Sequence, residues 1–474
     1  MSSIYFLGIG GTAMASVAVA LSHLGHAICG SDTALYPPMS TYLETNNIRY
    51  FKGFSEKNIS GSTPDLVVVG NAVSRGNCEL EYALNHRLQL ISMPELVRNE
   101  LIAKNTSLVV TGTHGKTTTT SILAWLLEYG GLKPGFLIGG IPENFSISCR
   151  ASGQKEPGFF VTEGDEYDTS FFDKRSKFML YRPDIAIINN MEFDHADIFD
   201  SFEDIRKSFR QFVNLIPGTG ILLVNGDDPA ACEASSGAFC PVERFGFSDG
   251  CDWSACDIFG SNGITTLTIC KNGKPEGTLS IPLAGRHNIM NALGAIAAAT
   301  HCGLHMETIT CAMPQFRRPK RRMEVTEGIR SGLTLIEDFA HHPTAIRATL
   351  EAITELCPGR RIIACFEPRS NTTTRNIFQQ ELAACFGPAS IVVLGKVHRP
   401  ERYAPDMQLD VSRLECELQE QNKSVFIAGT GSSDYPGDIV GFLESVIEEN
   451  DVVVLMSNGS FSNLKTLFLG NFGK

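Results

Sequence analysis

Short apolar runs alternate with stretches of helical spacing along most of the chain. Ser3 to Leu7 is an apolar run, an Ala/Val-rich helical stretch continues through Leu24, and a second apolar run begins at His26. The same alternation returns at Leu108 to Val110 and through the last third of the chain. Strands that alternate with helices form βαβ units, so the pattern predicts an α/β fold with mostly parallel sheets.

The stretch Ser107 to Thr120, SLVVTGTHGKTTTT, has the order strand, glycine-rich turn and helix that grips a nucleotide triphosphate. Glycines let backbone N–H groups turn toward phosphates, Lys116 would reach the β/γ oxygens, and the Thr117 hydroxyl could ligate Mg²⁺. The loop is a shortened G-x-x-G-K-T, because Val110 stands where the usual first glycine would be. The alternative is an ordinary turn with an exposed lysine, and the register of strand and helix favours the phosphate site.

Two acidic clusters follow apolar strands of the same region, EGDEYD from Glu163 and NNMEFDHAD through His195. Ligands of open α/β sheets bind beyond the carboxyl ends of the strands, and carboxylates there suit hard cations such as Mg²⁺. We therefore select Glu163 and His195 as candidate metal ligands. His114 could contact phosphate or only pack. Asn288, with Asn291 three residues on, could recognise a base or ribose, or could cap a helix.

The N-terminal turn GIGGTAM lies between a strand and a helix, as a dinucleotide-binding turn does, and Asp32 follows the second strand. Ala13 occupies the position of the last glycine of G-x-G-x-x-G, so the motif is weak by itself. It is compatible with the diphosphate of some nucleotide and does not support NAD specifically. A glycine turn required only for close packing is the alternative.

Length and local composition divide the chain into three predicted domains. At 474 residues, a prior of about 150 residues per domain gives three. We expect a Rossmann-like domain at 1–106, closed by a linker at 104–106, a central P-loop domain at 107–317 and a Rossmann-like domain at 318–474. Residues 247–282 alternate polar and apolar positions, which predicts a small antiparallel elaboration. A basic hinge, Phe316 to Met323, precedes the last domain and could be a solvated linker or could bring a cation to a triphosphate.

Charge and cysteine usage narrow the class of protein. The formal net charge is −12 without a long basic block, so we expect no nucleic-acid partner. No uncharged apolar run approaches the roughly 18 residues of a membrane helix, and no basic leader opens the sequence. Fourteen cysteines occur without a CxxC pair, which is typical of reduced thiols. We expect a cytoplasmic protein with small-molecule substrates.

The motifs TGTHGKTTTT, EGDEYD, NNMEFDHAD, GRHNIMNA, RRPKRRME and EDFAHHPTA occur in this order, and together they resemble the Mur ligase family. The resemblance spans nearly the whole chain and implies an ATP- and Mg²⁺-dependent ligase that forms an acyl phosphate on UDP-N-acetylmuramate before an amine attacks. The implied catalytic residues are Lys116, Glu163 and His195, with Thr117 and Glu163 on one Mg²⁺ and His195 on a second. The implied ATP contacts are Gly112, Thr113, His114, Gly115, Lys116, Thr117, Thr118, Asn288, Asn291, Arg322 and Asp338. The implied UDP-sugar contacts are Gly8, Gly10, Gly11, Thr12, Met14, Asp32 and Asn71, and the peptide-side candidates are His341, His342 and Arg369.

Within the family, the motifs EYDTSFFDKRSKF, EFDHADIFD, DFAHHPTA, EPRSNT and MSNGSF most resemble the branch that adds L-alanyl-γ-D-glutamyl-meso-diaminopimelate in peptidoglycan recycling. The L-alanine-adding branch of cell-wall biosynthesis typically has a His-Arg pair where this chain has Arg369-Ser370. That branch is the alternative, and a non-catalytic UDP-muramyl-binding protein is a remote one. We expect no carbamylated lysine ligand, because Phe209 and Arg210 stand near its usual place and Lys207 is offset. We expect a monomer or a weak homo-oligomer.

Overall fold

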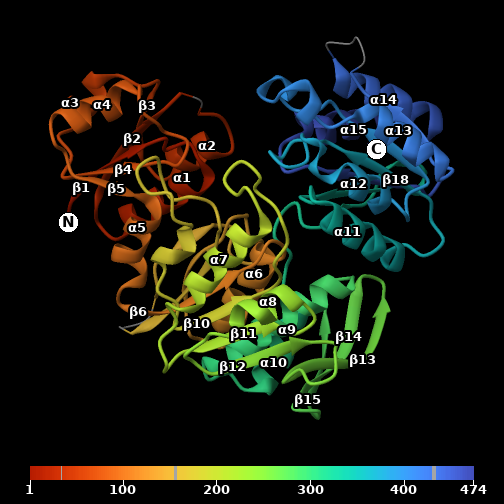
Figure 1. Ribbon diagram of the computed structural model, residues 1–474, viewed down its shortest axis with the longest axis horizontal. Coiled ribbons are helices and arrows are strands. Elements are labelled where there is room, and N and C mark those ends of the chain that lie inside the picture. The colour runs from red at the N-terminus through yellow and green to blue at the C-terminus, as the bar shows by residue number, and fades with distance from the viewer. Residues whose placement is uncertain (34, 154–156, 430–433, 474) are drawn as a thin grey trace.

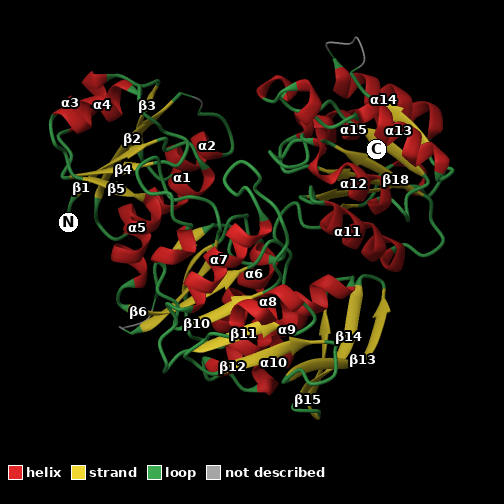
Figure 2. Ribbon diagram, viewed as in Figure 1, coloured by secondary structure: helices red, strands yellow, loops and turns green. Residues whose placement is uncertain are grey.

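Three β-sheets, each covered by helices, follow one another along the chain (Figures 1 and 2). The computed structural model describes residues 1–474 except 34, 154–156, 430–433 and 474. Within the described ranges, no helix has the length and apolar character that a membrane crossing requires. The α/β fold with mostly parallel sheets is therefore as predicted.

The N-terminal sheet is parallel and doubly wound, with the strand order β3-β2-β1-β4-β5. Its buried strands carry Val, Ile and Phe on both faces, which parallel strands between helices require. The strands are β1 (Ser3–Leu7), β2 (Ala27–Asp32), β3 (Arg49–Lys52), β4 (Leu66–Val69) and β5 (Leu90–Ser92). The helices are α1 (Thr12–His23), α2 (Met39–Thr45), α3 (Glu56–Ser62), α4 (Cys78–Asn85) and α5 (Met93–Val97).

The middle sheet has ten strands in the order β15-β14-β13-β12-β11-β10-β6-β9-β7-β8 and is parallel from β13 to β7. Its strands are β6 (Asn105–Thr111), β7 (Gly135–Leu137), β8 (Cys149–Arg150), β9 (Gly158–Gly164), β10 (Ile185–Ile188), β11 (Ile221–Asn225), β12 (Val242–Gly246), β13 (Trp253–Ser261), β14 (Ile264–Lys271) and β15 (Lys274–Ile281). Its helices are α6 (Lys116–Tyr129), α7 (Phe202–Val213), α8 (Pro229–Ser235), α9 (Arg286–His301) and α10 (Met306–Ala312).

Two sequence expectations for this region have different outcomes. The antiparallel elaboration is confirmed, because β13, β14 and β15 pair antiparallel within the stretch that alternates. The linker expected at residues 104–106 is wrong in part. Asn105 and Thr106 are the first residues of β6, where they pair with Gly158 and Phe159 of β9. Their polar side chains indicated a loop, but they are the partly exposed first residues of β6 and their backbone pairs with the neighbouring strand.

The C-terminal sheet has the order β16-β17-β21-β18-β19-β20, and only its edge strand β16 is antiparallel. The strands are β16 (Glu324–Thr326), β17 (Thr334–Asp338), β18 (Ile362–Phe366), β19 (Ile391–Leu394), β20 (Ser424–Ile427) and β21 (Val452–Met456). The helices are α11 (Pro343–Leu356), α12 (Gln379–Cys385), α13 (Val411–Glu420), α14 (Tyr435–Val446) and α15 (Leu464–Phe472). In Figure 1 this unit and the N-terminal unit both stand over the end of the middle unit where β6 leads into α6.

Candidate active site

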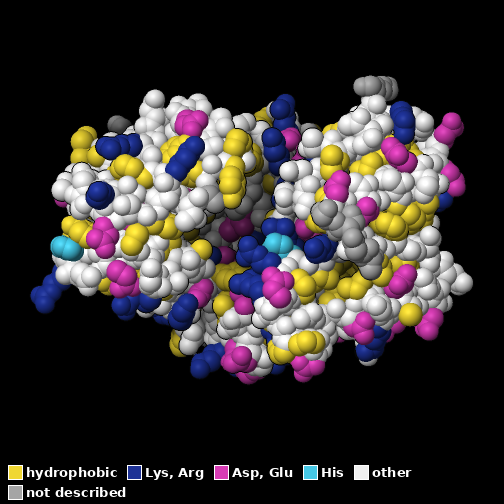
Figure 3. Space-filling model, turned by 90° about the horizontal axis from the view of Figure 1, so that it is seen from above, with side chains coloured by type: hydrophobic (Ala, Val, Ile, Leu, Met, Phe, Trp, Pro, Cys, Tyr) yellow, Lys and Arg dark blue, Asp and Glu magenta, His cyan; other side chains and the backbone are white. Residues whose placement is uncertain are grey.

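A cleft of about 1790 Å³ lies between the middle and C-terminal sheets and reaches Thr12 of the N-terminal unit. Figure 3, which looks onto the molecule from above, shows basic side chains and a histidine gathered around a hollow at the centre. Most of the predicted ATP-site residues line this cleft. The sequence order strand, turn, helix therefore positions a polar cavity, lined by both basic and acidic side chains, at the carboxyl ends of the parallel strands.

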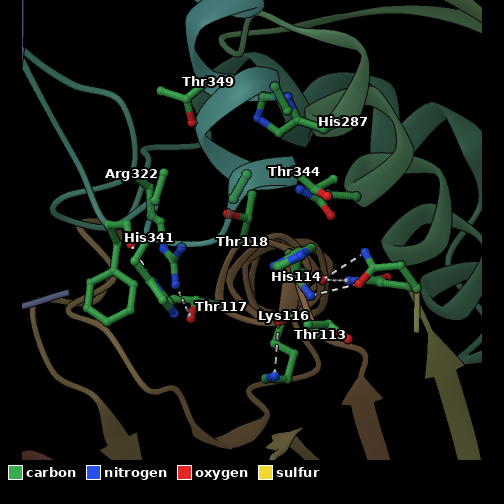
Figure 4. Close-up of a pocket in the computed structure, with 18 of the residues that line it drawn as sticks. Thr113, His114, Lys116, Thr117, Thr118, His287, Arg322, His341, Thr344 and Thr349 are labelled. Atoms are coloured by element: carbon green, nitrogen blue, oxygen red, sulfur yellow. Dashed lines mark hydrogen bonds between the residues drawn. The ribbon is translucent and has the colours of Figure 1, made fainter. Parts of the chain in front are cut away.

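The phosphate loop requires glycine at two places. After β6 ends at Thr111, Gly112 has φ +129° and Gly115 has φ +81°, a region that L side chains rarely adopt. A Cβ atom at Gly115 would lie 2.2 Å from Oδ1 of Asn291. The loop thus turns tightly against α9, and the first turn of α6 opens into the cleft with Lys116 and Thr117 (Figure 4).

Lys116 is held by its own loop and by a carboxylate. Its Nζ donates to the Gly112 carbonyl at 2.6 Å and lies 2.9 Å from Oε2 of Glu166. Burial acts to lower the pKa of Lys116, but the charges of Glu166 and Asp165 outweigh it and raise that pKa. The lysine is therefore a fixed cation beside the phosphate loop. Glu166 was not selected from the sequence, although the EGDEYD motif contains it.

Thr117 and Glu163 form an oxygen-donor pair. The Thr117 hydroxyl donates to Oε2 of Glu163 at 3.2 Å, and the Gly139 amide donates to Oε1 at 2.6 Å. Burial raises the pKa of Glu163, against the opposing effects of the Gly139 amide and the Arg322 charge. A hydroxyl and a carboxylate at a phosphate loop are donors that Mg²⁺ prefers, so these residues fit that cation.

The hinge brings a cation to the same pair. Arg322 is half-buried, and its Nη2 donates to the Thr117 hydroxyl at 3.1 Å. Its guanidinium also lies 4.8 Å from the ring centre of Phe339. Of the two readings that the sequence left open, the one in which the hinge reaches the phosphate loop agrees with this contact.

His195 lies within a second set of donor groups. Its Nε2 is 3.2 Å from Oε1 of Glu166, and donor atoms of Asp165, Glu166 and His195 all lie within 4.8 Å of one another. Burial acts to lower the pKa of His195, but the hydrogen bond and charge of Glu166 raise it. His195 has φ +56°, and its N–H donates to Oδ1 of Asp194 at 2.7 Å, so the neighbouring carboxylate holds this backbone conformation.

Asn288, Asn291 and Asp338 line the cleft, and each already has polar partners within the protein. Asn288 donates to the Ala284 carbonyl at 2.8 Å, and Asn291 Oδ1 accepts from Thr119 at 3.2 Å. The capping interpretation of Asn288 is wrong, because α9 begins one turn earlier with Gly285 as its N-cap. Asp338 accepts from the amides of Met323 and Ala340 at 2.7 and 2.8 Å, which ties the hinge to β17.

Several cleft residues were not selected from the sequence. His287 lies at the start of α9 (Figure 4), and burial lowers its pKa, so it is a neutral side chain in the cleft wall. Arg286 lies over the ring of Phe247 at 3.7 Å, and Glu192 lies 3.3 Å from His114. The motifs GRHNIMNA and NNMEFDHAD contain His287, Arg286 and Glu192, whereas Phe247 has no motif.

The C-terminal unit forms hydrogen bonds with the loop that carries His195. His342 Nε2 lies 3.2 Å from the Phe193 carbonyl, and Thr372 donates to Oδ1 of Asp194 at 2.7 Å. Further along the loop, Asn371 donates to Asp197 at 2.8 Å. The other two peptide-side candidates lie nearby: His341 Nε2 is 3.8 Å from Asp194, and Arg369 Nη1 is 3.4 Å from Glu367. His341 and Arg369 both line the cleft. The contacts of the C-terminal unit with the loop of residues 193–197 couple the position of His195 to that of the C-terminal unit.

The predicted UDP-sugar residues gather at the ends of β1, β2 and β4. Gly8 has φ +83°, and the Gly10 amide donates to Oδ2 of Asp32 at 2.9 Å, leaving no room for a side chain at Gly10. Gly11 is the N-cap of α1, Thr12 is exposed and lines the cleft, Met14 is buried, and Asn71 is exposed after β4. The seven candidates thus share one edge of the N-terminal sheet. Lys207 is exposed on α7 and is absent from the described lining of the cleft, so the prediction of no carbamylated ligand stands as a prediction.

Comparison with known proteins identifies a family and individual proteins that are similar to this chain in sequence and fold. Residues 3–104 match the Mur ligase family catalytic domain, residues 110–299 the Mur ligase middle domain, and residues 321–459 the Mur ligase glutamate ligase domain. The chain is 38% identical over 465 residues to a UDP-N-acetylmuramate–L-alanyl-γ-D-glutamyl-meso-2,6-diaminoheptandioate ligase of Haemophilus influenzae, covering 98% of each chain. It is 37% identical to the ligase of that name from Escherichia coli, covering 99% of this chain and 98% of the other. A solved murein peptide ligase from Psychrobacter arcticus superposes with a TM-score of 0.74 at 34% identity, covering 100% of this chain and 99% of the other.

The fold and the cleft define a three-domain P-loop protein with a large polar cleft between its α/β units. The chain belongs to the Mur ligase family and is an ATP-dependent amide-forming ligase. The family resemblance and the three-domain fold class predicted from the sequence are both confirmed.

Proposed function

We propose that this ligase joins L-alanyl-γ-D-glutamyl-meso-diaminopimelate to UDP-N-acetylmuramate at the expense of ATP, in the cytoplasmic recycling of peptidoglycan. The observation that carries the proposal is the full-length similarity to two relatives named for this reaction. The UDP-sugar would bind at the glycine edge of domain 1–106, ATP in domain 107–317, and the peptide against domain 318–474. The protein would work as a monomer or a weak homo-oligomer with no nucleic-acid or membrane partner.

In the proposed reaction, an oxygen of the muramyl carboxylate attacks the γ-phosphoryl group of ATP and releases ADP. The peptide amine then attacks the acyl-phosphate carbonyl, loses a proton and releases inorganic phosphate. The loop amides from Gly112 to Thr118 would orient the phosphates, and Lys116 and Arg322 would neutralise the transferring charge. Mg²⁺ held by Thr117 and Glu163, with a second at His195, would supply charge neutralisation when bound.

On the substrate side, Asn288, Asn291 and Asp338 would form the wall around the nucleoside of ATP. His341, His342 and Arg369 face the cleft from the C-terminal unit or lie directly beside it, and we assign them to the incoming peptide. Their contacts with the His195 loop support a reaction that requires the C-terminal unit in this position.

The test measures ATP-dependent phosphate release with UDP-N-acetylmuramate and either the tripeptide or L-alanine as the amine. We expect turnover with the tripeptide, and turnover with L-alanine alone would assign the biosynthetic reaction instead. Lys116→Ala should reduce turnover at least about 1000-fold while UDP-sugar binding persists. A cationic side chain that neutralises the charge of the transferring phosphoryl group contributes a rate factor of this size. Lys174→Ala is the matched control, since Lys174 forms an exposed pair with Asp168 outside the cleft lining. Unchanged phosphate release by Lys116→Ala, or UDP-sugar binding without turnover in the wild type, would overturn the assignment.

A further inference from the structure

His114, Glu192 and His342 form a compact cluster between the middle and C-terminal units, separate from the Thr117–Glu163 pair. His114 Nε2 and His342 Nδ1 each lie 3.3 Å from the same oxygen, Oε2 of Glu192. The donor atoms of all three residues lie within 4.8 Å of one another. His114 comes from the phosphate loop and His342 from the N-cap of α11, so the cluster spans the two units (Figure 4 shows His114).

His342 has one ring nitrogen that faces both the Glu192 carboxylate and a backbone amide. Its Nε2 faces the Phe193 carbonyl at 3.2 Å, and because a carbonyl only accepts, Nε2 carries the proton. Nδ1 accepts from the Thr344 amide at 3.3 Å. The ring is thus neutral, and a cation bound at Nδ1 would take the place of the Thr344 amide. Two acceptor atoms therefore face each other, and a cation would make that contact attractive.

The spacing and the ligand types select a class of cation. Tetrahedral coordination with bonds of about 2.0–2.1 Å places neighbouring ligand atoms about 3.3 Å apart. The two nitrogen–oxygen distances of the cluster have this value. Two imidazoles and one carboxylate suit Zn²⁺ and related transition metals, whereas Mg²⁺ prefers oxygen ligands. We propose that His114, Glu192 and His342 form a three-ligand site for a divalent transition-metal cation of the zinc type, with a fourth position open.

A cation at this site would join two parts of the chain that must move relative to each other if the cleft opens. The phosphate loop supplies one ligand, the loop before His195 supplies a second, and α11 of the C-terminal unit supplies the third. Zinc would therefore stabilise the arrangement described here and slow a catalytic cycle that includes opening. Binding needs no nucleotide, UDP-sugar or peptide, so its outcome is independent of the proposed reaction.

The test titrates the metal-free, full-length enzyme with Co²⁺ and with Zn²⁺ in excess Mg²⁺ and without nucleotide. We expect one Zn²⁺ per chain by equilibrium dialysis and a Co²⁺ absorption spectrum of tetrahedral intensity. His342→Gln, His114→Gln and Glu192→Gln should each weaken Zn²⁺ binding by at least about 10- to 100-fold, since even outer-shell partners contribute that much. Zn²⁺ should also raise the unfolding temperature of the wild type but not of these variants.

Two controls separate this site from its neighbours. His301→Gln removes a histidine that pairs with Glu243 outside the described lining of the cleft, and this variant should bind zinc like the wild type. His195→Gln removes the histidine of the Asp165–Glu166–His195 group, which also contains metal-ligand types, and it should keep the zinc site. Zinc binding that survives His342→Gln and disappears in His195→Gln would overturn the proposal, as would failure of Zn²⁺ to bind in the presence of excess Mg²⁺. Circular dichroism identifies a variant that fails to fold, and the remaining two variants then decide.

Discussion

Thr372 of the C-terminal unit donates its hydroxyl to Oδ1 of Asp194 in the middle unit, at 2.7 Å. The same carboxylate oxygen accepts the backbone N–H of His195, also at 2.7 Å. Asp194 thus holds the strained backbone of His195 with one interaction and the C-terminal unit with the other. A hydrogen bond between the two units is coupled through one atom to the position of a candidate catalytic histidine.

Thr372→Val should therefore impair catalysis more than folding. Loss of a hydrogen bond to a charged acceptor costs about 1.5–3 kcal/mol, and about 1.4 kcal/mol corresponds to tenfold. We expect kcat/KM to fall at least about tenfold, together with a higher Mg²⁺ concentration for half-maximal rate. Steady-state kinetics at varied Mg²⁺ measures both effects.

Thr374→Val is the matched control for that variant. Thr374 is also buried, but its hydroxyl donates to the Ser370 carbonyl within the C-terminal unit, at 2.9 Å. It should lower stability without changing the Mg²⁺ requirement. Equal effects of the two variants on the Mg²⁺ requirement would show that contact between the units does not position His195.

Gly115→Ala should damage the nucleotide site, and Gly131→Ala should not. Both glycines have φ near +80°, so each alanine carries a backbone strain of about 1–2 kcal/mol. A methyl group at Gly131 meets no atom within 4 Å, whereas at Gly115 it lies 2.2 Å from Asn291. We expect similar losses of unfolding free energy from strain, but at least about tenfold weaker ATP binding only for Gly115→Ala. Calorimetric titration with ATP distinguishes them, and equal affinities would show that the loop tolerates displacement of Asn291.

The sequence predicted the fold well because buried parallel strands have a local signal. Strands β18 (IIACF) and β21 (VVVLM) are continuous apolar runs in the last third of the chain, where the alternation predicted strands. The polar start of β6 was misread for the same reason, since Asn105 and Thr106 lack that signal. The phosphate loop was recognisable because its backbone chemistry demands glycines followed by Lys116 and Thr117.

The partners of these residues could not be predicted from local pattern. Glu166 and Glu192 stand in acidic motifs beside the residues that were selected, and only the folded chain brings them to Lys116 and His114. The contact between Thr372 and Asp194 joins positions 178 residues apart and has no periodicity to reveal it. Motifs therefore predicted many residues that line the cleft, but the pairing of side chains required the three-dimensional arrangement.

Gly459→Ala should affect the peptide selectively if Arg369 contacts it. A Cβ atom at Gly459 would lie 2.2 Å from Nε of Arg369, so the guanidinium must shift. We expect the KM for the tripeptide to rise about tenfold, by about 1.4 kcal/mol, while the KM values for ATP and UDP-N-acetylmuramate stay unchanged. Gly387→Ala is the control, because a methyl group there meets no atom within 4 Å. A uniform rise in all three KM values would argue against a peptide role for Arg369.

Asp227 offers a pH test of the cleft wall beside Arg286. Its carboxylate accepts the amides of Phe247 and Ser248 at 2.9 and 2.8 Å, and it thereby holds the ring against which Arg286 packs. Burial acts to raise the pKa of Asp227, but the Ser248 side chain, these two amides and the charge of Arg286 lower it below its ordinary value of 3.8. A carboxyl with a depressed folded-state pKa contributes stability that is present above its unfolded pKa and is lost as pH falls through the folded value.

Asp227→Asn should therefore lower the free energy of unfolding at pH 7 by about 1.5–3 kcal/mol, the usual contribution of a hydrogen bond to a charged acceptor. The difference from the wild type should shrink below pH 3.8 as the wild-type carboxyl takes up a proton and comes to resemble the amide. Urea unfolding at pH 7 and at successively lower pH measures it. Asp249→Asn, at an exposed carboxylate on the same loop, should change stability by less than about 0.5 kcal/mol at every pH. A difference in unfolding free energy between wild type and Asp227→Asn that stays constant across the pH range would mean that the charge of Asp227 does not hold the Phe247 loop. Packing alone would then determine the position of Arg286.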